Sequence, residues 1–163
     1  PPDGPDDPFE VHPYWIGLTP EGMKRELHVL GQLGPWPKMA SHIRSAHPAI
    51  INEYGWLWLH RDGTPTMLSE PVYENMNLTG PETTADQRFK AYAYTLASQT
   101  EFFRAYREFA GVMYLAYLDG DVPGASTCDN FRNPGTLELE PHFADFMGEA
   151  FKPLGVCISF WNP

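Results

Sequence analysis

Apolar and polar positions along the chain form blocks that predict strands separated by helices. The stretch Phe9-Glu10-Val11 is a short strand candidate, and the apolar runs at 49–51 and 111–118 also have the lengths of strands. Between these runs, apolar residues recur at helical spacing within 20–33 and 86–108. This order predicts βαβ units and therefore a parallel sheet with right-handed crossovers.

Both main helices have recognisable termini. Thr19 is a predicted N-cap with Pro20 at the first helical position, and Gly34 ends the first helix. The sequence Thr84-x-x-Gln87 is a capping box that opens the second helix. The residues predicted on the buried side of this second helix are Phe89, Tyr92, Ala93, Leu96, Phe103 and Tyr106.

Less regular segments fill the rest of the chain. Shorter helices are predicted near 37–45 and 141–150, and a last strand at 155–161. The stretch 56–83 contains several glycines and prolines, which predicts a long loop. Its aromatic residues, among them Tyr73, predict that this loop is ordered.

Polar residues follow three of the predicted strands at the point where each strand ends. They are His12-Pro13-Tyr14, Asn52-Glu53-Tyr54 and Asp119-Gly120-Asp121. The carboxyl ends of parallel strands meet at one edge of a sheet, and α/β folds build their sites there. We therefore expect the three strand ends to contribute to one functional site.

Composition narrows the range of partners. The 163 residues suit one domain, and a hydrophobic share of 42% supplies material for a core. The formal net charge of −10 argues against nucleic acid or an anionic membrane surface as partner, because both are bound by basic patches. No apolar run is long enough to span a bilayer.

Glu53 is the central candidate for chemistry. A carboxylate at the end of an apolar strand is partly desolvated, which is costly unless it is hydrogen-bonded. Glycosidases use such a carboxylate as nucleophile or acid/base against an oxocarbenium-like transition state. Trp56 and Trp58 follow closely, and indole faces pack on the C–H faces of sugar rings. Spacing alone also fits, and slightly favours, a surface or helix-capping glutamate beside core tryptophans.

The segment PAIINEYGWLWLHRDGTPT, residues 48–66, resembles the seventh strand of the (β/α)₈ catalytic domain of clan A retaining glycoside hydrolases. The resemblance is to glycoside hydrolase family 2, the β-galactosidase and β-glucuronidase type. In that family the glutamate of Glu-Tyr-Gly is the catalytic nucleophile, which implies this role for Glu53. The sequence VHPY at 11–14 is similar to the sixth strand, and AGVMYLAYL at 110–118 is similar to the eighth.

The resemblance implies an α/β architecture, with strands six to eight of a TIM barrel over residues 1–153. Residues 154–163 would then begin a β-sandwich extension. Strands one to five and the acid/base are expected upstream of residue 1, so we expect a fragment that is inactive by itself. The whole enzyme would hydrolyse O-glycosidic bonds of oligo- or polysaccharides. Its expected location is secreted or periplasmic in a bacterium, with no signal visible in this sequence.

The resemblance also implies residues that contact a carbohydrate substrate. Tyr14 would hydrogen-bond Glu53 and keep it ionised. A tryptophan of the 56–83 loop would replace the sugar platform that many relatives carry at the end of strand eight. The substrate-binding candidates are His12, Tyr14, Tyr54, Trp56, Trp58 and Asp119.

Several of these roles have alternatives. Asn52-Glu53 is also similar to the Asn-Glu pair that carries the acid/base at strand four, although the following Tyr-Gly favours the nucleophile. Tyr54 fits a hydrogen bond at the site or simple packing. Asp119 fits contacts to substrate hydroxyls or a loop cap. His12 fits a structural hydrogen bond equally well. A non-catalytic carbohydrate-binding relative, or an α/β scaffold with no sugar site, also remains open.

No metal or other cofactor is predicted. The histidines at 28, 42, 47, 60 and 142 have no metal-ligand spacing such as H-E-x-x-H. Cys157 lies in an apolar strand pattern and is predicted to be a buried free thiol, with a bond to Cys128 as the alternative. Arg61-Asp62-Gly63 predicts a turn, from which Arg61 is a candidate contact to an acidic sugar.

Overall fold

A computed structural model describes residues 9–11, 49–55, 57–105, 109–115 and 119–156. The predicted helices at 20–33 and 37–45 lie outside these residues, as does most of the predicted last strand at 155–161. No helix among the described residues is both long enough and apolar enough to cross a membrane.

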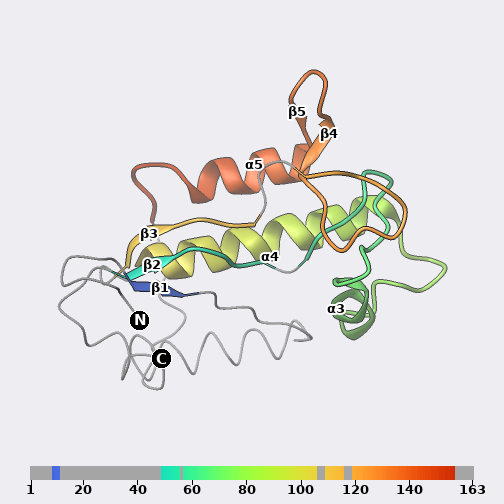
Figure 1. Cartoon of the computed structure of the whole chain (residues 1–163), viewed down its shortest axis with the longest axis horizontal. Coiled ribbons are helices and arrows are strands. Elements are labelled where there is room, and N and C mark those ends of the chain that lie inside the picture. Colours follow the sequence, from blue (N-terminus) through green and yellow to red (C-terminus); the bar gives the residue numbers. More distant parts are fainter. Residues whose placement is uncertain (1–8, 12–48, 56, 106–108, 116–118, 157–163) are drawn as a thin grey trace.

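A parallel sheet of three strands is formed by β1 (Phe9–Val11), β2 (Ala49–Ile51) and β3 (Phe109–Val112). The strands lie in the order β1-β2-β3, so β2 is central (Figure 1). Both strand pairs are parallel, which confirms the predicted parallel arrangement. The long helix α4 (Ala85–Ala105) comes between β2 and β3 in the chain, as a βαβ unit requires.

Strand β3 is shorter than the sequence predicts. The apolar run suggested a strand over 111–118, whereas β3 begins at Phe109 and ends at Val112. Two further backbone hydrogen bonds continue the contact with the β2 segment, from Met113 N to Ile51 O (2.8 Å) and from Leu115 N to Tyr54 O (3.5 Å). Met113 is 50% exposed, so this run is not covered on both faces as a fully buried strand would be.

Helix α4 begins as predicted. Thr84 N donates to Gln87 Oε1 (2.8 Å), and Gln87 N donates to Thr84 Oγ1 (3.2 Å), which is the reciprocal pattern of a capping box. Helix α5 (Pro141–Ala150) confirms the predicted short helix and runs beside α4 (Figure 1). The Glu140 carboxylate caps α5 by accepting from Phe143 N (2.7 Å).

The hydrophobic core lies between the sheet, α4 and α5. Of the residues predicted on the inner side of α4, four are buried and Phe89 is partly buried, whereas Tyr106 lies outside the described residues. The Tyr54 and Phe103 rings meet edge-on with centroids 5.3 Å apart. The four buried α4 residues are Tyr92, Ala93, Leu96 and Phe103.

The loop predicted at 56–83 contains regular structure that the sequence did not indicate. Helix α3 (Glu70–Asn75) has a proline in its first turn and buries Val72 and Tyr73. Tyr73 donates its hydroxyl to Leu57 O (2.7 Å), so the loop is ordered as expected. Farther along the chain, β4 (Phe131–Asn133) and β5 (Glu138–Leu139) form an antiparallel pair that was not predicted.

Candidate functional site

Glu53 lies two residues beyond the end of β2, the central strand, and its side chain is half-buried. It therefore occupies the carboxyl-end edge of the parallel sheet, where α/β folds place functional side chains. Among the other predicted site residues, His12, Tyr14 and Trp56 lie outside the described residues.

Tyr54, the next residue, packs in the core. Its side chain is fully buried, and its hydroxyl forms a 2.6 Å hydrogen bond with Thr100 Oγ1 of α4. Burial raises the pKa of the Tyr54 phenol well above its ordinary value, so it stays neutral. Of its two sequence alternatives, the geometry matches packing, with the ring holding the Glu53 segment against α4.

Trp58 is also buried, with 1% of its surface exposed. Its indole Nε1 donates to Leu115 O (2.7 Å), which lies just beyond β3. The ring therefore ties the segment after β2 to the segment after β3, and it offers no open face to a sugar in this structure.

Asp119 holds a loop together at the end of the β3 segment. One carboxylate oxygen accepts from Gly120 N (2.7 Å), and the other accepts from the Thr127 hydroxyl. Asp119 N in turn donates to Asp129 Oδ2 (3.4 Å). These contacts match the loop cap among the two roles expected for Asp119.

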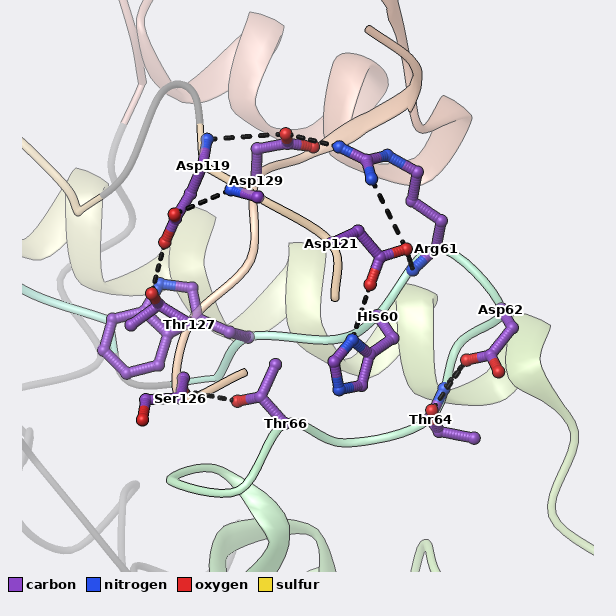
Figure 2. Close-up of polar contacts among 12 residues, drawn as sticks. His60, Arg61, Asp62, Thr64, Thr66, Asp119, Asp121, Ser126, Thr127 and Asp129 are labelled. Atoms are coloured by element: carbon purple, nitrogen blue, oxygen red, sulfur yellow. Dashed lines mark hydrogen bonds and ion pairs between the residues drawn. The ribbon is translucent and has the colours of Figure 1, made fainter. Parts of the chain in front are cut away.

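Arg61 joins the loop after β2 to the loop after β3 (Figure 2). Its Nη2 lies 2.6 Å from Asp129 Oδ2, and its Nη1 lies 3.4 Å from Asp121 Oδ2. Its Nε donates to Phe131 O (3.0 Å). Two carboxylates thus neutralise the guanidinium, so Arg61 is occupied and not free to bind an acidic sugar.

The residues around Arg61 form a tight turn, as the sequence predicts. Gly63 N donates to His60 O (2.7 Å), and His60 N donates to Thr64 O (2.7 Å). The Asp62 carboxylate accepts from the Thr64 hydroxyl and backbone N–H, which lower the pKa of Asp62. Gly63 has a φ of 81°, which favours glycine there.

His60 presents its ring to Asp121, with Nδ1 donating to Oδ1 at 2.6 Å (Figure 2). Burial of Asp121 would by itself raise its pKa, but the hydrogen bonds from His60 and from Arg61 N outweigh that effect and lower the pKa. Cys128 lies close by, and burial together with the nearby carboxylates raises the pKa of its thiol to about 12. A thiol of that kind is not a nucleophile near neutral pH.

The sequence spacing gave no sign of this cluster. His60 stands apart in the chain from Asp121 and Cys128, so only the fold brings their ligand atoms together, all within 4.8 Å of one another. The sequence could have indicated the proximity of His60 and Asp121 only through their positions, because each residue follows the end of one of two neighbouring strands. An open pocket of about 630 Å³ is lined by His60, Asp121, Asp62 and Glu70, among others.

Comparison of the chain with protein-family models, with curated proteins and with solved structures finds no match. A role for Glu53 therefore depends on its place in the sheet and on the motif around it.

Proposed function

We propose that the chain is the C-terminal part of the (β/α)₈ catalytic domain of a retaining glycoside hydrolase, with Glu53 as the nucleophile. The observation that carries the proposal is the position of Glu53 directly beyond the central strand of a parallel sheet. Catalytic residues of (β/α)₈ enzymes come from this end of the strands. The Glu-Tyr-Gly motif at that position is the one on which the family resemblance rests.

The strand order supports the proposal. Consecutive strands of a (β/α)₈ barrel are parallel neighbours, each followed by a helix. Here β1, β2 and β3 are neighbours in chain order, and α4 follows β2. This is the arrangement required of barrel strands six, seven and eight. The proposal places strands one to five upstream of residue 1.

The proposed reaction is a double displacement. The Glu53 carboxylate attacks the anomeric carbon as the glycosidic C–O bond breaks, while an acid upstream of this chain protonates the leaving oxygen. A covalent glycosyl-enzyme results. The same upstream group then takes a proton from water, which attacks the anomeric carbon and releases Glu53. The two carboxyl groups must lie about 5–5.5 Å apart for this mechanism.

The proposal gives structural support and sugar contact to different residues. Tyr54 and Trp58 support the Glu53 segment from the core, through Thr100 and Leu115 O respectively. Within the proposal, His12, Tyr14 and Trp56 supply contacts to the sugar and to Glu53. Because Arg61 is paired with two carboxylates, we propose a neutral oligo- or polysaccharide as substrate. The proposed setting is secreted or periplasmic in a bacterium.

The test is chemical rescue in the protein expressed from its full reading frame. Glu53→Ala should lower the hydrolysis of aryl glycosides by about 10³-fold or more, because the nucleophile is lost. Added azide should restore turnover and give a glycosyl azide of inverted configuration. Glu70→Ala, which removes an exposed carboxylate of α3, is the matched control and should leave the rate unchanged.

Two outcomes contradict the proposal. One is a Glu53→Ala protein that hydrolyses aryl glycosides at the original rate. The other is a protein with no turnover whose saccharide binding survives Glu53→Gln, which would identify a non-catalytic carbohydrate-binding relative.

A further inference from the structure

Three potential metal ligands of different chemical types meet in the loops beyond β2 and β3. His60 follows β2, whereas Asp121 and Cys128 belong to the loop after β3. Their ligand atoms all lie within 4.8 Å of one another. We propose that His60, Asp121 and Cys128 form a zinc-binding site. None of the three has a role in the proposed glycosidase chemistry.

The donor set selects the class of metal. Calcium and magnesium take oxygen ligands almost exclusively, whereas imidazole and thiolate suit zinc. One nitrogen, one oxygen and one sulfur give three protein ligands, which leaves a fourth tetrahedral position for water or another ligand. Zinc binding replaces the direct His60–Asp121 hydrogen bond and releases the Cys128 thiol proton to solvent.

The surroundings orient two of the ligands. The turn that follows His60 fixes its backbone through two 2.7 Å hydrogen bonds, from Gly63 N and to Thr64 O. Asp121 Oδ2 accepts from Arg61 N (3.1 Å) and faces the Arg61 guanidinium (3.4 Å), which leaves Oδ1 directed at His60. Outer contacts of this kind orient metal ligands and raise affinity.

The site also has a route for the ion. His60 and Asp121 line the open pocket of about 630 Å³, whereas Cys128 is 1% exposed and closes the site on the protein side. An ion entering from the pocket would meet the imidazole and the carboxylate first and the sulfur last. A defined entry path is one of the conditions for a functional metal site.

The experiment is titration of the metal-free full chain with Co²⁺ and with Zn²⁺. We expect one ion per chain with a dissociation constant in the micromolar range or below, and a thiolate-to-cobalt charge-transfer band in the near ultraviolet. Zinc should also raise the melting temperature, because it binds only the folded chain. Absence of saturable binding below millimolar metal would overturn the proposal.

Variants assign the ligands. Cys128→Ser should abolish the charge-transfer band, and His60→Gln and Asp121→Asn should each weaken Zn²⁺ binding by about tenfold or more. The controls are His142→Gln, which removes a histidine paired with Asp86, and Cys157→Ser, which removes the chain's other thiol. Neither residue is one of the three proposed ligands, so both variants should bind Zn²⁺ as the original chain does.

The outcomes stay decisive even where one variant folds poorly. If Cys128→Ser does not fold, a cobalt band that persists unchanged in both His60→Gln and Asp121→Asn overturns the proposal. Loss of the band in Cys157→Ser but not in Cys128→Ser also overturns it. Glu53→Gln should bind zinc unchanged, which separates this site from the proposed catalytic role.

Discussion

At the scale of the residue, Arg61 connects the loop after β2 to the segment after β3 through several polar contacts. Its guanidinium reaches Asp121 and Asp129 in the loop after β3 and the carbonyl of Phe131 at the start of β4, about sixty to seventy residues later in the chain. The Asp129 side chain is fully buried, so its charge depends on Arg61 and on its own hydrogen bonds for compensation.

Removal of the Arg61 side chain should therefore lower the stability of the fold. We expect Arg61→Met to lower the free energy of unfolding by about 3 kcal/mol, because it leaves the buried Asp129 carboxylate without its cation. Urea denaturation measures the change. Lys152→Met is the matched control, since it removes a cation from an exposed pair with Glu149, and we expect a loss of about 0.5 kcal/mol or less. Equal effects of the two substitutions would contradict this account of Arg61.

At the scale of the element, the turn between the β2 segment and α3 packs directly against the start of α4. Gly63 combines a φ of 81° with close contact, because a Cβ placed there would lie 2.5 Å from the Cβ of Ala85. The Gly63 carbonyl also accepts from Arg88 Nε of the same helix. The turn and the helix therefore fix each other's position.

Gly63→Ala should destabilise the protein through both strain and overlap. Gly124 provides the comparison, because its φ is 75° but nothing lies within 4 Å of a Cβ placed there. We expect Gly124→Ala to cost about 1 kcal/mol and Gly63→Ala to cost at least about 2 kcal/mol more, as measured by thermal or urea denaturation. Losses of equal size would show that the contact with Ala85 relaxes freely.

The elements that were predictable are those whose signals are local. The Thr84 capping box and the apolar spacing of α4 depend on residues within a few turns of one another, and the structure confirms both. The loop between β4 and β5 contains the turn sequence Pro134-Gly135, but the two strands are only three and two residues long, too short to show an alternating apolar pattern. The extent of β3 depended on how the rest of the fold covers it, which a single apolar run does not specify.

The candidate site was predictable only in part. Glu53 was placed correctly beyond a strand because strand ends follow directly from the apolar pattern. Packing in the core was one of the alternatives that the sequence offered for Tyr54 and Trp58. The sequence could not decide between packing and sugar contact, since burial depends on partners about fifty residues away, Thr100 and Leu115. The cluster of His60, Asp121 and Cys128 depends in the same way on contacts between distant loops.

At the scale of the whole molecule, three parallel strands place Glu53 at the carboxyl end of the sheet. The buried side chains of Tyr54 and Trp58 connect this end to α4 and to the segment after β3. The formal net charge of −10 fits a neutral saccharide better than an acidic one, because acidic polymers would be repelled. We propose that Glu53 at this end of the sheet is a nucleophile rather than a structural glutamate.

The most direct measurement is covalent labelling of the protein from its full reading frame with a 2-deoxy-2-fluoro glycosyl fluoride, followed by peptide mass spectrometry. The slow hydrolysis of the fluoro-sugar ester traps the glycosyl-enzyme on the nucleophile. The account predicts one added sugar, located on Glu53 within the peptide that contains Asn52-Glu53-Tyr54, and its loss in Glu53→Gln. Stoichiometric labelling of any peptide that lacks Glu53 would contradict it.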